Sequence, residues 1–182
     1  MHIPKLEIDK SWTLFLDRDG VLNRQLSGAY VRTPQELELL PGVTEAMAFF
    51  NGAFGHIVIA TNQQGIGKGL MTEKDLHLVH FHLWKQIVEK GGRIDDFYFC
   101  PGLERDDPPC RKPNTGMAHE AKRDFPEIVF EKSIMVGDKV TDMEFGKAVD
   151  MTTVYLAETP IERADIDYHF ISLQAFASFL RD

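Results

Sequence analysis

The sequence is most informative at residues 13–23, which read Thr13-Leu14-Phe15-Leu16-Asp17-Arg18-Asp19-Gly20-Val21-Leu22-Asn23. The mostly apolar residues 13–16 predict a buried strand of a parallel sheet. Open sheets of this kind place their chemistry at the carboxyl ends of the strands, where Asp17 and Asp19 fall. Asp17 is a candidate nucleophile, because a carboxylate can attack phosphorus and form an aspartyl-phosphate. Asp19 is a candidate acid and base that protonates the leaving oxygen and then activates water, and Gly20 permits a tight turn.

Two other kinds of site have similar sequences, and spacing excludes both. A calcium loop of the EF-hand type needs an oxygen ligand at its fifth position and Glu at its twelfth, where this chain has Val21 and Gly28. A nucleotide-binding P-loop needs Gly six residues before its Lys and Ser or Thr after it, and around Lys68 those positions hold Asn62 and Gly69. A solvated loop is the common explanation of an isolated Asp-x-Asp, so the phosphoryl-transfer hypothesis depends on motifs further along the chain.

Composition and charge are those of an ordinary globular protein. The 182 residues are 43% hydrophobic and 26% charged, which fits a single domain over residues 1–182. The net charge of -8 comes without a basic block, which argues against nucleic acid or an anionic membrane as a partner. No apolar run could span a membrane and no secretory signal pattern is present, so we expect a cytoplasmic protein. We also expect a monomer or weak oligomer that acts on a small molecule.

Apolar patterns alternate between strand and helix along the whole chain. The expected strands lie at residues 13–16, 56–60, 96–100, 133–136, 152–156 and 168–171. The expected helices begin near residues 43, 72, 113, 141 and 172, with capping residues at Thr72, Thr141 and Ser172 and with Pro113 in a first turn. This alternation predicts an α/β fold, a doubly wound, Rossmann-like three-layer sandwich with a mostly parallel sheet and no separate cap domain. Residues 21–40 are expected to form a loop over the site.

Further polar residues follow the predicted strands. Thr61 comes directly after one strand, and a hydroxyl with backbone N–H groups at a strand end can bind a phosphoryl oxygen. Arg111 and Lys112 are two cations that could neutralise a nucleophile and a transferring phosphoryl group. Asp138 ends the fourth strand, and with Asp17 and a backbone carbonyl near Asp19 it could hold Mg²⁺. Asp142, one helical turn later, is either a further acid of this site or a helix N-terminal acid.

The order of these motifs resembles the haloacid dehalogenase superfamily, specifically its phosphatases without a cap domain. The resemblance spans residues 12–181 and implies a nucleophile at Asp17, an acid and base at Asp19, phosphoryl binding by Thr61 and Lys112, and Mg²⁺ at Asp138. The segments at 17–20, 61–63, 100–101, 111–113 and 137–139 resemble two enzyme families, the heptose 1,7-bisphosphate phosphatases and the histidinol-phosphate phosphatases. The first is favoured, and the resemblance adds Asn62, Gln63, Arg111 and Lys139 as substrate-binding residues.

The chain departs from these families in one loop. Relatives carry a structural zinc bound by Cys-x-His and Cys-x-Cys before Arg-Lys-Pro, but here Gly102 and Pro108 replace two of the four ligands beside Cys100 and Cys110. We therefore expect no structural zinc. The two cysteines could be in contact or form a disulfide, although a reducing cytoplasm disfavours the bond. The histidines at 77, 80 and 82 are expected to be surface or partly buried side chains rather than replacement ligands.

Two other classes of protein share parts of this pattern. A phospho-acceptor signalling domain also uses a strand-end Asp, a Thr and a Lys on a doubly wound sheet, but it lacks an acid and base at the position of Asp19. A binding module without activity is the second alternative, and the complete set of catalytic positions disfavours it. Turnover of a small phosphate ester separates an enzyme from both.

Overall fold

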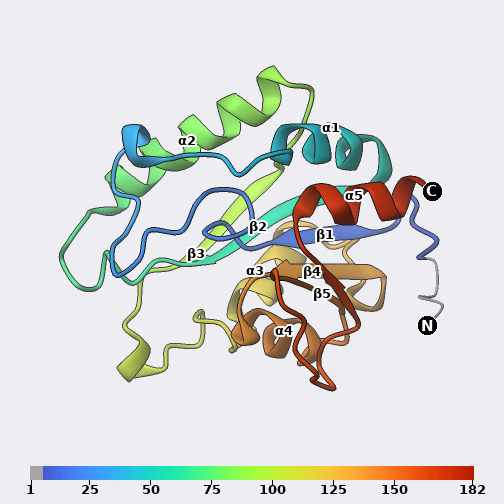
Figure 1. Cartoon of the computed structure of the whole chain (residues 1–182). Helices are drawn as coiled ribbons and strands as arrows, with labels where there is room; N and C mark the ends of the chain where they lie inside the picture. Colours follow the sequence, from blue (N-terminus) through green and yellow to red (C-terminus); the bar gives the residue numbers. More distant parts are fainter. Residues whose placement is uncertain (1–5) are drawn as a thin grey trace.

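The computed structural model describes residues 6–182, and its centre is a six-stranded sheet (Figure 1). The strands are β1 (Thr13–Leu16), β2 (His56–Asn62), β3 (Asp96–Cys100), β4 (Ser133–Gly137), β5 (Thr152–Leu156) and β6 (Tyr168–Phe170). They are all parallel and lie in the order β3-β2-β1-β4-β5-β6. The chain therefore builds outward from β1 in one direction, returns to β4, and builds outward in the other. This arrangement confirms the predicted doubly wound α/β fold.

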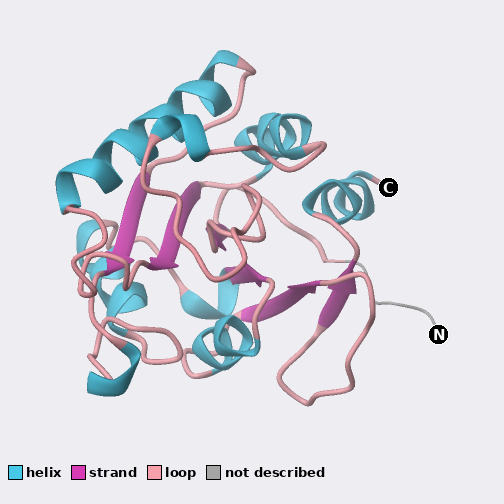
Figure 2. Ribbon diagram, turned by 60° about the vertical axis from the view of Figure 1, so that its left-hand side comes forward, coloured by secondary structure: helices cyan, strands magenta, loops and turns pink. Residues whose placement is uncertain are grey.

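Five α-helices cover the two faces of the sheet (Figures 1 and 2). They are α1 (Val43–Ala53), α2 (Glu73–Glu89), α3 (Gly116–Asp124), α4 (Val140–Lys147) and α5 (Leu173–Arg181). Helices α1, α2 and α5 lie on one face, and α3 and α4 lie on the other. Right-handed crossovers through helices are the usual way to join parallel strands, and they leave both faces of the sheet buried.

The side chains of the central strands alternate between two apolar cores. Leu14 and Leu16 of β1 pack in the core under α1, α2 and α5, whereas Phe15 packs in the core against α3 and α4. Strand β4 repeats the pattern, with Ile134 on the first side and Met135 on the second. Successive strand residues point to opposite faces, so a run without polar residues is what a strand buried on both faces requires.

The sequence predicted two of four helix starts correctly and two wrongly. Thr72 caps α2, accepting a hydrogen bond from the backbone N–H of Asp75 at 3.1 Å, and Ser172 caps α5 in the same way, as predicted. The prediction for α4 was wrong, because its N-cap is Lys139, whose backbone N–H donates to Asp142 at 3.0 Å. Pro113 was also misplaced, since α3 begins three residues later at Gly116. In α4, the Asp142 carboxylate accepts this backbone N–H, so the helix begins at Val140, ahead of the predicted cap Thr141.

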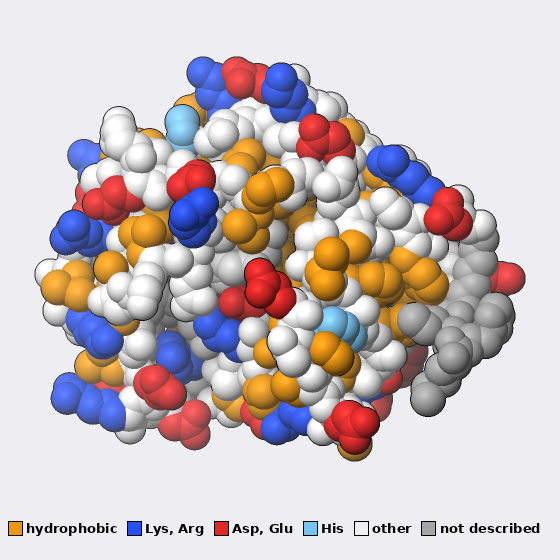
Figure 3. Space-filling model, viewed as in Figure 1, with side chains coloured by type: hydrophobic (Ala, Val, Ile, Leu, Met, Phe, Trp, Pro, Cys, Tyr) orange, Lys and Arg blue, Asp and Glu red, His pale blue; other side chains and the backbone are white. Residues whose placement is uncertain are grey.

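The reversal of strand order between β1 and β4 positions the site. Crevices in open α/β sheets form at such reversals, outside the carboxyl ends of the strands. The long connection from β1 to α1 contains a short 3-10 turn, Pro34–Glu36, and isolated bridges of Asn23 with Asp19 and Leu39. Part of this connection lies over the crevice. Within the described part of the chain, no helix is both long and apolar enough to cross a bilayer. On the face shown in Figure 3, acidic and basic side chains are interspersed.

Candidate active site

The strand ends bring the predicted residues together at the crevice. Asp17 continues β1, and its backbone N–H donates to the carbonyl of Val136 in β4 at 3.0 Å. This bond extends the parallel ladder by one residue and fixes the backbone of Asp17. The residue is only 3% exposed. Thr61 lies within β2, which is longer than predicted, and Asp138 directly follows β4. Three neighbouring strands therefore deliver one polar group each to the same edge of the sheet.

Lys112 is the buried cation of this site. Its ammonium lies 3.0 Å from Oδ1 of Asp17 and 2.6 Å from Oδ1 of Asp142, and it donates to the carbonyl of Ala60 at 2.6 Å. Burial acts to lower the pKa of Lys112, but the two carboxylates outweigh burial and raise it above its ordinary value. Lys112 is therefore a fixed positive charge beside the candidate nucleophile.

Asn62 holds the segment that carries Lys112. The amide of Asn62 donates to the backbone carbonyl of Lys112 at 3.1 Å and accepts from its backbone N–H at 3.0 Å. Asn62 also lines the cavity of the site. The substrate-binding role that the sequence suggests for Asn62 stays a prediction, and these two hydrogen bonds show that its side chain also joins β2 to the loop.

Asp19 is held by three donors on the other side of Asp17. Arg18 Nη2 lies 2.9 Å from each of its carboxylate oxygens, and Asn23 and Gln63 each donate to one of those oxygens at 2.9 Å. Burial works to raise the pKa of Asp19, but these donors outweigh it and leave the pKa below its ordinary value. Gln63 also donates to Oγ1 of Thr61 at 3.0 Å. The sequence predicts that Gln63 binds substrate; its side chain is buried and connects Asp19 to Thr61.

Three carboxylates crowd one corner of the site. Asp17, Asp138 and Asp142 each offer an oxygen, and these oxygens lie within 4.8 Å of one another. Burial raises the pKa of Asp138 to about 7, helped by the charges of Asp17 and Asp142 and opposed by Lys139 and Lys112. Oδ1 of Asp138 is buried and has no hydrogen-bond partner among the described residues. A hard divalent cation takes oxygen ligands of this kind, so the residues present fit Mg²⁺.

Lys139 and Asp142 form ion pairs around the three-carboxylate corner, and the sequence predicted these contacts only in part. The Lys139 ammonium lies 3.6 Å from Oδ2 of Asp17 and 3.5 Å from Oδ1 of Asp138, and these carboxylates raise its pKa although burial opposes them. Asp142 is fully buried against Lys112, so its role is larger than that of a helix N-terminal acid. The sequence left the role of Asp142 open, because its contact with Lys112 depends on a loop thirty residues earlier.

Gly20 allows the turn after β1 to approach Asp138. Its φ of +90° is a conformation that other residues rarely adopt, and a Cβ atom there would lie 2.1 Å from Oδ2 of Asp138. The turn can therefore bring the backbone beside the carboxylate cluster only with glycine at this position.

A cavity of about 630 Å³ opens in front of these residues. Seven predicted site residues line it, namely Asp17, Asp19, Thr61, Asn62, Arg111, Lys112 and Lys139. The loop after β1 contributes Tyr30, whose hydroxyl accepts from Lys68 at 2.9 Å. Arg111 lies 3.6 Å from Glu104, while its Nη1 is buried without a hydrogen-bond partner in the described chain. The expected loop over the site is therefore present, and several cations line the cavity.

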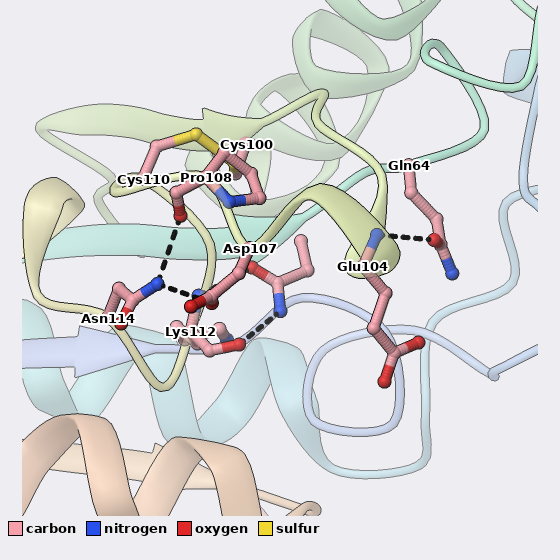
Figure 4. The surroundings of a disulfide bond; sticks show 9 residues. Gln64, Cys100, Glu104, Asp107, Pro108, Cys110, Lys112 and Asn114 are labelled. Carbon is pink, nitrogen blue, oxygen red and sulfur yellow. Dashed lines mark hydrogen bonds between the residues drawn. A yellow bond between two sulfur atoms is a disulfide. The ribbon is translucent and has the colours of Figure 1, made fainter.

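A disulfide joins Cys100, the last residue of β3, to Cys110, which precedes Arg111 (Figure 4). From the sequence, a contact or a disulfide was possible, with the bond disfavoured by a reducing cytoplasm; the structure has the disulfide. Packing explains the difference, because Cys100 is fully buried and the loop returns to it with a Cα–Cα distance of 5.3 Å, which suits a disulfide. From just beyond the closed loop, Asn114 donates to Asp107 at 2.8 Å and to the carbonyl of Pro108 at 3.1 Å, both of which lie within it.

Fold and site together define a class of protein, a phosphatase of the haloacid dehalogenase-like hydrolases. The family model described as HAD-hydrolase-like matches residues 109–170, which include Lys112, Asp138 and Asp142. The crystal structure of a D,D-heptose 1,7-bisphosphate phosphatase from Bordetella bronchiseptica, complexed with magnesium and phosphate, superposes with a TM-score of 0.82 at 26% identity, covering 93% of this chain and 98% of that one.

Two relatives identify the family within this class of phosphatases. A D-glycero-alpha-D-manno-heptose-1,7-bisphosphate 7-phosphatase from Mycobacterium bovis is 39% identical over 91% of this chain and 90% of its own length. The corresponding enzyme from Campylobacter jejuni is 33% identical over 95% of this chain and 98% of its own. The chain belongs to the haloacid dehalogenase-like phosphatases, in the family that contains these heptose bisphosphate phosphatases. It is therefore an enzyme, and the signalling-domain and binding-module alternatives are set aside.

Proposed function

We propose that this chain is a Mg²⁺-dependent phosphatase that removes the 7-phosphoryl group of D-glycero-D-manno-heptose 1,7-bisphosphate through an aspartyl-phosphate on Asp17. One observation carries the proposal: Asp17 lies at the end of β1 with the buried ammonium of Lys112 at 3.0 Å, facing a cavity of about 630 Å³. A carboxylate held beside a fixed cation can approach a phosphoryl dianion without uncompensated negative charge.

In the first step, an oxygen of Asp17 attacks phosphorus while the bond from phosphorus to the sugar oxygen breaks. Asp19 gives its proton to that leaving oxygen. The lowered pKa of Asp19 makes it a carboxylate before substrate binds, and the approaching phosphoryl dianion favours the uptake of the proton that this step needs. Lys112 and Thr61 are placed to bind the phosphoryl oxygens.

In the second step, Asp19 takes a proton from water as the water oxygen attacks phosphorus. The bond between phosphorus and Asp17 breaks, which restores the carboxylate and releases inorganic phosphate. Asn62 and Gln63 support both steps without touching phosphorus, because the first holds the backbone of Lys112 and the second connects Asp19 to Thr61.

We propose Asp17, Asp138 and the backbone carbonyl of Asp19 as the protein ligands of Mg²⁺. The buried, unpartnered Oδ1 of Asp138 supports this choice. When bound, the ion supplies positive charge that offsets the crowding of the carboxylates and draws electron density from the phosphoryl oxygens.

The cavity has more cations than one phosphoryl group needs, and the second phosphate of a bisphosphate substrate would bind the additional ones. Arg111, Lys68 and Lys139 all line the cavity, and the buried Nη1 of Arg111 is free to donate to a second phosphate. The names of the relatives from Mycobacterium bovis and Campylobacter jejuni support the heptose bisphosphate. Histidinol phosphate, which carries one phosphate, is the alternative substrate.

Steady-state kinetics on the two anomers of the heptose bisphosphate and on histidinol phosphate test the proposal. We expect kcat/KM to be at least about a hundredfold higher for one heptose anomer than for histidinol phosphate, equivalent to one or two good charge-assisted contacts with the second phosphate. A higher value for histidinol phosphate would overturn the substrate assignment. The variant Asp17→Asn, which removes the proposed nucleophile, should lose activity on all of these substrates. Asp107→Asn is its matched control, because Asp107 lines the same cavity outside the carboxylate cluster.

A further inference from the structure

Arg18 is a charged side chain placed entirely inside the protein. It is 0% exposed, although it lies between the two candidate catalytic aspartates in sequence. Its Nη2 alone meets both carboxylate oxygens of Asp19, at 2.9 Å each. A single nitrogen leaves the guanidinium plane free to turn, so a second contact must fix the orientation of the group.

His80 of α2 supplies that second contact. Its Nε2 lies 3.3 Å from Nη1 of Arg18. A guanidinium can only donate hydrogen bonds, so Nε2 of His80 must accept, and the proton of the neutral ring is on Nδ1. Burial and the charges of Arg18 and His77 lower the pKa of His80 to about 2, so the ring stays neutral wherever the enzyme works.

The ring of His80 is itself held in place. It stacks on Phe97 of β3 with ring centroids 4.4 Å apart and planes at 16°, and Phe99 lies edge-on to it at 6.2 Å. The residue is only 4% exposed. A contact that begins on a fixed ring in α2 therefore continues through Arg18 to the carboxylate of Asp19.

We propose that His80 is a positioning residue of the phosphatase reaction, which orients the Asp19 carboxyl through Arg18. The inference rests on the proposed function, because it assumes that Asp19 protonates the leaving oxygen. In that step the Asp17–phosphorus bond forms, the bond from phosphorus to the leaving oxygen breaks, and the proton of Asp19 moves to that oxygen. Misalignment of Asp19 slows this proton transfer and leaves the attack by Asp17 unchanged.

The leaving group separates positioning from packing. An alkyl or sugar oxygen needs a proton as it departs, whereas the p-nitrophenolate anion leaves without one. Asp19 also activates water in the second step, which both substrates share, so only the first step separates the two cases. A variant with a misplaced Asp19 should therefore lose the rate of phosphoenzyme formation from an alkyl phosphate and retain that rate with p-nitrophenyl phosphate. A variant with a generally disturbed site should lose both.

The experiment compares His80→Phe, His80→Gln and the control His77→Gln on glycerol 3-phosphate and p-nitrophenyl phosphate. Phe keeps the stacking on Phe97 but removes the acceptor, and Gln restores an acceptor. His77 is exposed and one helical turn earlier on α2. Rapid acid quench measures the rate of phosphoenzyme formation, and for His80→Phe we expect this rate to fall about tenfold or more with the alkyl phosphate and to change less than about threefold with the aryl phosphate. His80→Gln should recover most of the loss, and His77→Gln should match wild type.

Equal losses on both substrates, or a change in KM alone, would overturn the proposal. If His80→Phe does not fold, His80→Asn makes the same comparison with His80→Gln, because its shorter amide lies further from Arg18. The variant Asp19→Asn tests the acid role of Asp19 separately from the positioning role of His80. If Asp19→Asn discriminates between the two leaving groups and His80→Phe does not, only the role of His80 fails. If Asp19→Asn does not discriminate either, the acid role of Asp19 fails first.

Discussion

Breaking the Cys100–Cys110 disulfide should destabilise the protein while leaving its catalytic centre assembled. The bond closes the loop between β3 and Arg111, with ten residues of sequence separation. The perturbation is either a reductant or the double variant Cys100→Ser/Cys110→Ser. Serine nearly matches cysteine in size, so the variant removes the crosslink with little change in packing at the buried end of β3.

The magnitude follows from the size of the closed loop. A crosslink lowers the entropy of the unfolded chain, and a ring of about eleven residues gives about 2.7 kcal/mol in the chain-entropy treatment. For a protein of this size, each kcal/mol shifts Tm by about 2–4 °C, so loss of the bond should lower Tm by about 5–11 °C.

The site should survive this change because Lys112 has other anchors. Asn62 makes two hydrogen bonds to the backbone of Lys112, and the ammonium contacts Asp17 and Asp142. Arg111 has fewer, since its only ion pair within the described chain is with the exposed Glu104. Reduction should therefore raise KM for a bisphosphate more than it lowers kcat.

Calorimetry of oxidised and reduced protein, combined with thiol titration after unfolding, tests the argument. The oxidised protein should show no free thiols, and the Cys100→Ser/Cys110→Ser variant should melt at the temperature of the reduced wild type and ignore reductant. Two free thiols in freshly unfolded, unreduced protein, or equal Tm values with and without reductant, would refute the reasoning.

Five further outcomes are expected. Asp17→Asn should reduce turnover by at least about a thousandfold and abolish the phosphoenzyme detected by mass spectrometry after acid quench, and wild-type turnover would contradict the nucleophile assignment. Exhaustive chelation should abolish activity, Mg²⁺ should restore it and Ca²⁺ should inhibit, because the larger ion permits bidentate binding by Asp17. Because the pKa of Asp138 is about 7 without a cation, the proton competes with Mg²⁺ below that pH, so calorimetric Mg²⁺ affinity should weaken as pH falls from about 8 to about 6. Arg111→Ala should raise KM for a bisphosphate by about tenfold and leave KM for a monophosphate nearly unchanged. Elemental analysis of protein purified without chelator should find no zinc, whereas one zinc per chain would show that the loop was misread.

The sequence could predict the residues that follow directly from strand patterns. Asp17, Thr61 and Asp138 are fixed by apolar runs whose carboxyl ends must meet at one edge of the sheet. Lys112 was identified through motif order, and its contact with Asp17 confirms that the loop returns to the strand ends. The all-parallel sheet follows from the same alternation of strands and helices.

The supporting contacts were not predictable because they join distant segments. The pairing of Asn62 with the backbone of Lys112 spans fifty residues, and nothing local to either residue indicates it. Arg18 reads as a surface residue in sequence, since charged side chains are seldom fully buried without a partner. Its burial becomes understandable only when Asp19 and His80 surround it.

The strand order has a consequence for how the chain can fold during synthesis. Strand β1 lies between β2 and β4, and β4 begins about 120 residues after β1 ends. At a translation rate of about 5–20 residues per second, one edge of β1 waits roughly 6–24 s for its neighbour. During that interval Leu14, Phe15 and Leu16 present an apolar edge with unpaired backbone groups, which is a template for pairing with other chains. The nascent N-terminal half is therefore where a ribosome-associated chaperone would be needed most, and where fragments ending before Ser133 should aggregate.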